Sequence, residues 1–71
     1  MGETPLLNTL KVARTAAGLT QADLAELVGV TRKTINTVEN GVFVPSTVLA
    51  LKVARALGTS VETLFQLPDT A

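Results

Sequence analysis

Residues 21–40, QADLAELVGVTRKTINTVEN, indicate two short helices joined by a tight turn. Apolar residues recur at three- and four-residue spacing on either side of Gly29, and glycine is typical of the position just past a helix end. The pattern predicts helices over 21–28 and 32–40. Helices that cross at such short range need a small residue at the crossing, and Ala25 stands four residues before the turn. We also expect that a Cβ atom at Gly29 would clash inside the turn.

Short helices continue in both directions from this unit. Four glycines, at 18, 29, 41 and 58, mark helix ends, and Thr, Ser and Pro residues ahead of the apolar runs mark helix starts. The first helix is expected to begin at Thr4-Pro5, a capping residue followed by a proline that suits the first helical turn. No segment shows the alternation of polar and apolar residues that would predict a β-strand instead of a helix. The sequence predicts an all-α, compact five-helix bundle with helices over about 5–17, 21–28, 32–40, 47–57 and 61–66.

The chain has the length of one domain, which we expect to be residues 1–66 with the two-helix unit at 21–40 and a C-terminal tail at 67–71. A hydrophobic content of 46% predicts a folded core, and an aromatic content of 3% means that this core is aliphatic. No apolar run approaches the roughly 18 residues of a membrane span. A cytoplasmic location is therefore expected.

The residue types that most enzyme and metal chemistry requires are missing. The chain contains no His and no Cys, which removes disulfides, the usual zinc ligands and the common nucleophile–base pairs. It has no glycine-rich phosphate loop, and Asp23 and Glu26 are better explained as part of a solvated helix face. We expect a protein that is not an enzyme and that has no cofactor or metal site.

The second helix of the unit has one apolar and one polar face. At about 100° per residue, Ile35 and Val38 lie opposite a polar arc of about 140°. The arc contains Arg32, Lys33, Asn36, Thr37 and Asn40. Such a face suits the major groove of DNA, where Arg or Lys can reach guanine O6 and N7 and Asn can pair with adenine. The alternative is an ordinary solvated helix face.

The stretch from Leu10 to Phe65, about four-fifths of the chain, resembles the Cro/repressor-type (lambda-repressor-like) helix-turn-helix family of phage and bacterial transcription regulators. The matching positions are Leu10 and Arg14, Gly18-Leu19-Thr20-Gln21, Leu24-Ala25, Gly29-Val30-Thr31-Arg32, Thr34-Ile35, Val38-Glu39, Gly41, Pro45-Ser46, Ala54, Ala56-Leu57-Gly58 and Leu64-Phe65. Position 42 departs from the family, because Val stands where Lys or Arg is frequent.

The resemblance implies sequence-specific binding to double-stranded DNA and transcription regulation, most often as a repressor. It implies that base edges are read by Arg32, Lys33, Asn36 and Thr37, and that the DNA backbone is contacted by Gln21, Thr31 and Asn40. It also implies that Arg14 pairs with Glu39 to link the first and third helices. The alternative for this pair is that Arg14 extends along the surface and Glu39 is solvated.

The charge balance favours a homodimer. Six basic and six acidic residues give a formal net charge of zero. A neutral monomer with few phosphate partners binds DNA weakly, so useful affinity requires two subunits on one site. The preferred interface is the C-terminal part with Leu64, Leu67 and the neighbouring surface of the fourth and fifth helices, and the second choice is the loop 42–44. Leu67 could instead cover the core of its own domain.

Two other functions remain open. The chain could be a protein-interaction module, such as an antitoxin-like partner, which the apolar 42–44 loop and the neutral charge favour. It could also be the DNA-binding part of a longer regulator. The polar residues at 32, 33, 36 and 37 favour DNA as the partner.

Overall fold

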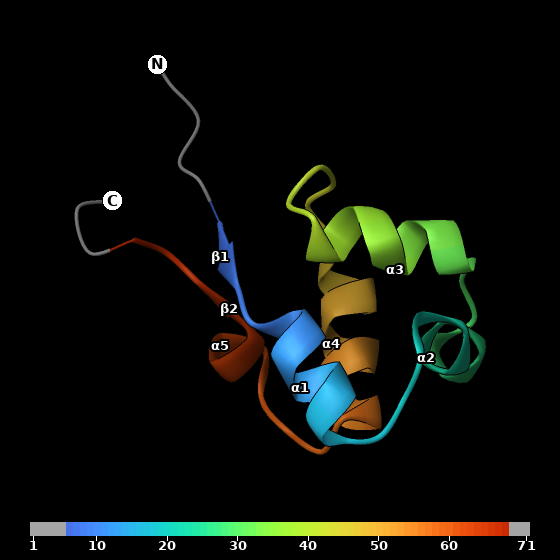
Figure 1. The fold of residues 1–71 in the computed structure, drawn as a ribbon. Helices are drawn as coiled ribbons and strands as arrows, with labels where there is room; N and C mark the ends of the chain where they lie inside the picture. The colour runs from blue at the N-terminus through green and yellow to red at the C-terminus, as the bar shows by residue number, and fades with distance from the viewer. Residues whose placement is uncertain (1–5, 69–71) are drawn as a thin grey trace.

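The computed structural model describes residues 6–68, which form five helices and one two-stranded sheet (Figure 1). The elements are β1 (Leu7–Asn8), α1 (Leu10–Ala16), α2 (Gln21–Val28), α3 (Arg32–Glu39), α4 (Thr47–Ala56), α5 (Val61–Leu64) and β2 (Phe65–Gln66). The prediction of a compact, mostly helical five-helix fold is confirmed. No helix within residues 6–68 has the length and apolar character that crossing a membrane requires. Of the predicted tail, residues 69–71 lie outside the described part.

Hydroxyl side chains cap the N-termini of four helices. Each accepts a hydrogen bond from the backbone N–H three residues later, and the capping residues are Thr20, Thr31, Ser46 and Ser60. At α2 the Thr20 N–H also donates to the Asp23 carboxylate at 2.9 Å, which completes a capping box and lowers the pKa of Asp23 below its usual value. Because these caps are local, the bounds of α2, α3 and α4 were predicted to within one residue.

The start of the first helix was predicted wrongly. Its expected beginning at Thr4-Pro5 lies outside the described residues, residues 6–9 are not helical, and α1 begins at Leu10. Asn8 accounts for the late start, because its side-chain oxygen accepts a hydrogen bond from the Leu10 N–H at 3.3 Å. A side chain bonded in this way to the backbone two residues later favours a turn over a continued helix.

A short antiparallel pairing occupies chain ends that were predicted to be helical. β1 pairs with β2, with Leu7 opposite Gln66, and the Thr9 N–H donates to the Leu64 C=O at 2.8 Å. The backbone of β2 is therefore bonded across to β1 rather than along a helix. The predicted helix 61–66 was two residues too long for this reason, and the fold is not purely α-helical.

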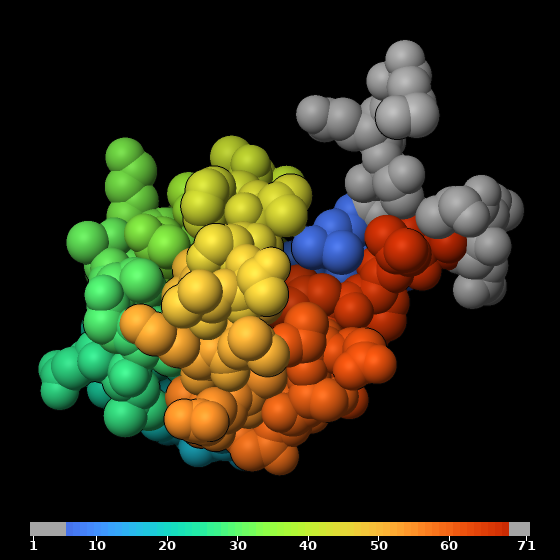
Figure 2. All heavy atoms as spheres, turned by 180° about the vertical axis from the view of Figure 1, so that it is seen from behind, coloured from blue at the N-terminus to red at the C-terminus, as the bar shows by residue number. Residues whose placement is uncertain are grey.

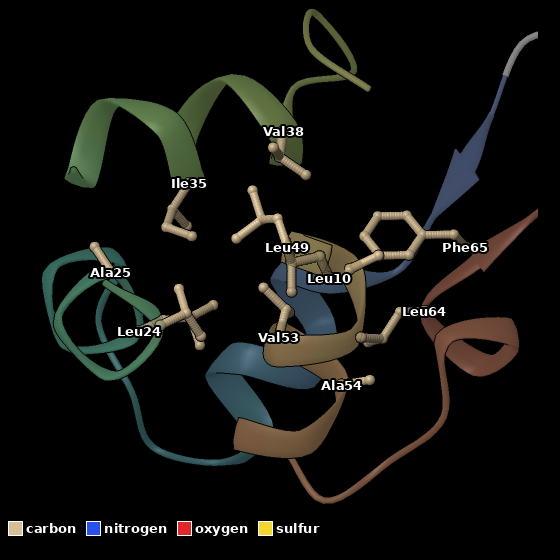
Figure 3. Packing of buried hydrophobic residues seen from close by; sticks show 12 residues of the cluster. Leu10, Leu24, Ala25, Ile35, Val38, Leu49, Val53, Ala54, Leu64 and Phe65 are labelled. Carbon is tan, nitrogen blue, oxygen red and sulfur yellow. The ribbon is translucent and has the colours of Figure 1, made fainter. Parts of the chain in front are cut away.

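The core lies around α4, against which the other helices pack (Figures 1 and 3). The four surrounding helices each contribute one large, fully buried side chain, and these are Leu10, Leu24, Ile35 and Leu64. They meet the buried face of α4, formed by Leu49, Ala50, Val53 and Ala54. Leu64 is 0% exposed. The prediction that Leu64 contacts a partner subunit was therefore wrong, because it lies inside the core of its own domain.

The α2–α3 crossing depends on Ala25 and Gly29. Ala25 is 3% exposed and lies on the side of α2 that faces α3 (Figure 3). Gly29 has a φ of +77°, and apart from Gly29 itself and its two chain neighbours no residue has an atom within 4 Å of the place that a Cβ would occupy. The expected clash at Gly29 was wrong. Glycine is favoured there because the backbone is left-handed, a conformation that L side chains rarely adopt.

Candidate nucleic-acid interface

α3 lies along one edge of the molecule, across the end of α4 (Figure 1). Its inner face is buried through Ile35 and Val38, as predicted. On the outer face, the exposed residues are Arg32, Lys33, Asn36 and Asn40, and Thr37 is half-buried. The structure also brings α2 to this face, because a polar hollow of about 310 Å³ is lined by Gln21, Arg32, Lys33 and Asn36.

The outer face of α3 is locally positive because the one acidic residue of the helix is neutralised. Arg32 and Lys33 are adjacent and exposed at its first turn, whereas Glu39 is bound to Arg14. A chain with a formal net charge of zero thus presents two free cations on one polar surface. Within residues 6–68, no three His, Cys, Asp or Glu side chains gather closely enough to hold a metal ion.

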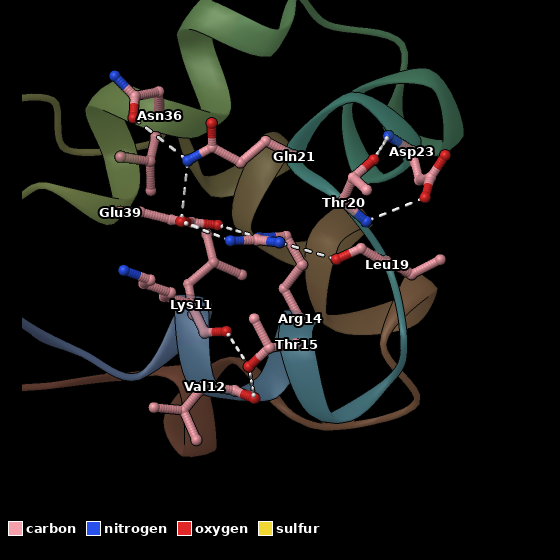
Figure 4. A network of polar contacts seen from close by, with 12 residues as sticks. Lys11, Val12, Arg14, Thr15, Leu19, Thr20, Gln21, Asp23, Asn36 and Glu39 are labelled. Carbon is pink, nitrogen blue, oxygen red and sulfur yellow. Dashed lines mark hydrogen bonds and ion pairs between the residues drawn. The ribbon is translucent and has the colours of Figure 1, made fainter.

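A buried ion pair joins α1 to the C-terminal end of α3. Arg14 Nε and Nη2 donate to the two carboxylate oxygens of Glu39 at 2.5 and 3.2 Å, and Arg14 Nη1 donates to the Leu19 C=O at 2.8 Å (Figure 4). The two side chains are only 9% and 2% exposed. The hydrogen bonding to Glu39 raises the pKa of Arg14 above its already high value. The pair fixes α3 relative to α1.

Hydrogen bonds continue from this pair to the outer face of α3 (Figure 4). Gln21 Nε2 donates to Glu39 Oε1 at 3.1 Å and to Asn36 Oδ1 at 3.2 Å. Asn40 Nδ2 donates to the same Asn36 oxygen at 3.3 Å. Both hydrogens of the Gln21 amide are thus used inside the protein. The structure brings five of the predicted site residues, Gln21, Asn36, Asn40, Arg14 and Glu39, into one connected network.

Two other predicted contacts are hydroxyls that already have partners within α3. Thr31 Oγ1 accepts from the Thr34 N–H at 3.2 Å and caps the helix, while Thr37 Oγ1 donates to the Thr34 C=O at 2.9 Å. These bonds use the Thr37 hydrogen but leave acceptor lone pairs on its oxygen. In this geometry the Thr37 hydroxyl can therefore only accept a hydrogen bond from a ligand.

Asn8 is a positioning residue that the sequence reasoning missed. Its Nδ2 donates to the Val38 C=O at 3.1 Å, while its Oδ1 accepts from the Leu10 N–H. One side chain therefore ties β1 and the start of α1 to the last turn of α3. The sequence carries a weak local signal, an Asn ahead of an apolar run, but nothing in it points to a partner 30 residues away.

The chain matches known transcription regulators over most of its length. Residues 10–64 match the model of the Helix-turn-helix family. YgzD of Bacillus subtilis, named as an HTH-type transcriptional regulator, is 42% identical over 62 residues, which cover 87% of this chain and 94% of that protein. An HTH-type transcriptional regulator of Methanothermobacter thermautotrophicus is 51% identical over 57 residues, covering 79% of this chain and 83% of that protein.

Solved structures agree with the sequence matches. The restriction-modification controller protein C.AhdI of Aeromonas hydrophila has a TM-score of 0.74 and 43% identity, over 79% of this chain and 85% of that chain. The clp gene regulator ClgR of Corynebacterium glutamicum has a TM-score of 0.71 and 35% identity, over 73% of this chain and 55% of that chain. The resemblance stated above, and the DNA-binding and regulatory function that it implied, are confirmed. This chain belongs to the helix-turn-helix family of DNA-binding transcription regulators.

Proposed function

We propose that this protein acts as a repressor that places α3 in the major groove of a specific DNA site. The observation that carries the proposal is the exposed face of α3, which is polar along its length and begins with two free cations. Base edges are contacted by Arg32, Lys33, Asn36 and Thr37. Repression fits a domain this small, because blocking a site requires occupancy of the DNA alone.

Contacts to the DNA backbone are assigned to residues at the ends of the two helices. Gln21 is the first residue of α2, so its backbone N–H has no acceptor within the helix and is free to bind a phosphate at the positive end of the helix dipole. Its side chain is held by Asn36 and Glu39 instead. Thr31 and Asn40, at the two ends of α3, lie where the groove walls would pass.

Replacing Arg32 or Lys33 with Ala is expected to weaken specific binding by about 1–3 kcal/mol if the side chain pairs with a base. The site is first obtained by selection from random duplex DNA with the unaltered protein. Fluorescence anisotropy titrations on the selected duplex, at several salt concentrations, then give the affinity and the number of phosphates neutralised.

The matched control is Lys11→Ala, which removes one exposed cation from α1 and lines neither the hollow on α3 nor those on α4 and α5. It is expected to leave base preference unchanged. If the Arg32→Ala/Lys33→Ala variant binds the selected duplex as tightly as the parent protein, α3 is not the reading helix.

A protein-binding module is the second candidate function, and the loop after α3 favours it. Val42, Phe43 and Val44 are 78%, 47% and 67% exposed. Three consecutive exposed apolar side chains are unusual on a surface without a partner. The same selection separates the two functions, because a module that only binds protein enriches no DNA sequence.

The active form is proposed to be a two-fold dimer on a near-palindromic site. Two cations on α3 and a net charge of zero give one copy few phosphate partners. Two copies double those contacts and place two reading helices about 34 Å apart, which matches half-sites one turn of DNA apart.

The outer surface of α4 and α5 is the proposed interface. Val48 and Leu51 of α4 are 62% and 57% exposed, and Leu51 and Val61 border two adjoining hollows of about 370 and 700 Å³. The atoms of α4 form a continuous band beside those of α5 in Figure 2. Leu67, beyond β2, is 66% exposed and is assigned to the same interface. The polar rim of the larger hollow contains both positive and negative side chains, namely Lys52, Arg55 and Glu62.

A second copy fits this surface because the rim is self-complementary. The cations lie on α4 and the carboxylate lies on α5. A two-fold axis can therefore place the cations of one copy opposite the carboxylate of the other. The hollows also share no lining residue with the one on α3, which leaves both reading helices free. The 42–44 loop remains the second choice.

Sedimentation tests the dimer. At micromolar concentration the unaltered protein is expected to sediment as a dimer and Leu51→Lys as a monomer, because the new charge would be buried at the interface. Leu27→Lys is the matched control, since Leu27 is 62% exposed on α2. A parent protein that stays monomeric with and without the selected duplex would rule out the dimer.

A further inference from the structure

The side-chain oxygen of Asn36 has no capacity left for DNA. An amide oxygen accepts two hydrogen bonds in its plane, and here both come from the protein, from Gln21 Nε2 at 3.2 Å and Asn40 Nδ2 at 3.3 Å. Its amide nitrogen keeps both hydrogens, because it makes no hydrogen bond within residues 6–68. What Asn36 presents to the outside of α3 is an NH₂ group alone.

The orientation of this amide is fixed from within the domain by Glu39. The Glu39 side chain is 2% exposed, and both of its carboxylate oxygens already accept hydrogen bonds from Arg14. The Gln21 atom that faces it must therefore be the nitrogen, because an oxygen there would meet a second acceptor. The same Gln21 nitrogen faces Asn36 and must donate, which requires the Asn36 oxygen to point inward.

We propose that Glu39, acting through Gln21, makes Asn36 a donor-only reading group that selects a base by a hydrogen-bond acceptor in the major groove. Suitable acceptors are guanine N7 and O6, adenine N7 and thymine O4. Bidentate pairing with adenine, which the sequence alone suggested for an Asn at this position, needs the Asn oxygen as well and is excluded. Glu39 and Gln21 are positioning residues in this assignment, and Asn36 is the contact.

The inference rests on the proposed function, since it assumes that α3 reads a groove. Its test begins by finding the base position whose preference disappears in Asn36→Ala. In Asn36→Asp, one carboxylate oxygen can still accept from Gln21 and Asn40, while the outer atom becomes an acceptor. A preference for guanine or thymine at that position is expected to move to cytosine or adenine, whose amino groups donate, by about tenfold relative to the parent base. Retention of a guanine or thymine preference by Asn36→Asp overturns the inference.

Glu39→Gln tests the positioning role by a change that loss of stability alone would not produce. The substituted amide can donate to Gln21, which can then turn its oxygen toward Asn36 and reverse the Asn36 amide. Preference at the Asn36 position is expected to shift toward bases with an amino group, while the position read by Arg32 keeps its preference. An unchanged preference at the Asn36 position would show that Glu39 and Gln21 do not orient the Asn36 amide.

A measurement on the unaltered protein is independent of how any variant folds. Each purine of the selected half-site is replaced in turn by its 7-deaza analogue, which lacks the N7 acceptor, and each adenine by purine, which lacks the amino donor. No adenine-to-purine change at the Asn36 position is expected to lower affinity. A loss of about tenfold on removing that amino group would show bidentate adenine pairing and overturn the inference. The Arg32 and Lys33 variants report separately on whether α3 reads DNA at all.

Discussion

Replacing Arg14 with Met is expected to destabilise the domain by about 3–5 kcal/mol. The substitution leaves Glu39, whose side chain is 2% exposed, as a buried charge without its ionic partner. It also leaves the Leu19 C=O without the 2.8 Å hydrogen bond from Arg14. Small domains have a total stability of about 5 kcal/mol at the low end, so a loss of this size would unfold much of the protein at room temperature. Urea denaturation followed by circular dichroism measures it.

The double variant Arg14→Met/Glu39→Leu separates the cost of an unpaired charge from the value of the pair. Removing both partners leaves no buried charge, so most of the lost stability is expected to return. Arg32→Met, at an exposed position on α3, controls for the loss of an arginine and should change the stability of the DNA-free protein by no more than about 0.5 kcal/mol. A double variant as unstable as Arg14→Met would contradict this account. Even a stable double variant is expected to lose base preference at the position read by Asn36, because Gln21 would have no carboxylate to orient it.

Ala25→Leu is expected to cost about 3 kcal/mol or more. Ala25 is 3% exposed on the side of α2 that packs on α3, and these two helices make the most extensive contact in the described part of the molecule. Extra carbon atoms there force the helices apart or into strained rotamers. The thermal midpoint measures the loss.

Ala22→Leu is the matched control for this prediction. Ala22 lies on the same helix, is exposed, and receives the same added volume. Its effect is expected to stay within about 0.5 kcal/mol. Equal thermal midpoints for the two variants would mean that α2 and α3 do not pack as closely as described.

The helices could be predicted from the sequence because their signals are local. Thr20 and Thr31 bond to backbone groups three residues away, and Gly29 has the left-handed conformation expected at a helix end. Each of these features involves a few consecutive residues. The reason given for Gly29 was nevertheless wrong, because a sequence can indicate that a glycine is needed without indicating whether space or backbone conformation requires it.

The β1–β2 pairing could not be predicted, because two-residue strands are too short for any alternation of polar and apolar residues. Their pairing depends on a contact between residues at opposite ends of the chain. Leu64 was misplaced for a related reason. Helical periodicity identifies it as one side of a helix, but only the packed structure shows that this side faces the domain's own core.

The candidate site, like the fold, has one part that could be predicted from the sequence and one part that could not. The polar face of α3 follows from helical geometry, so the sequence could place Arg32, Lys33 and Asn36 together on one face of the helix. Which atom of Asn36 points outward depends on Gln21 and Glu39, and on distances between α2 and α3 that a sequence does not contain. The base that an amide reads is therefore a tertiary property, even when the position of the amide is a local one.

The register of β1 against β2 determines how the domain responds to a mechanical load. Leu7 lies opposite Gln66, so a force that pulls these two residues apart acts at the same end of both strands. In that geometry the backbone hydrogen bonds break one after another, as in unzipping, instead of sharing the load. The next bonds in line are Thr9 N–H to Leu64 C=O and the link from Asn8 to Val38. Tension applied through the chain ends is thus expected to detach the strands first and to reach the turn between α2 and α3 last.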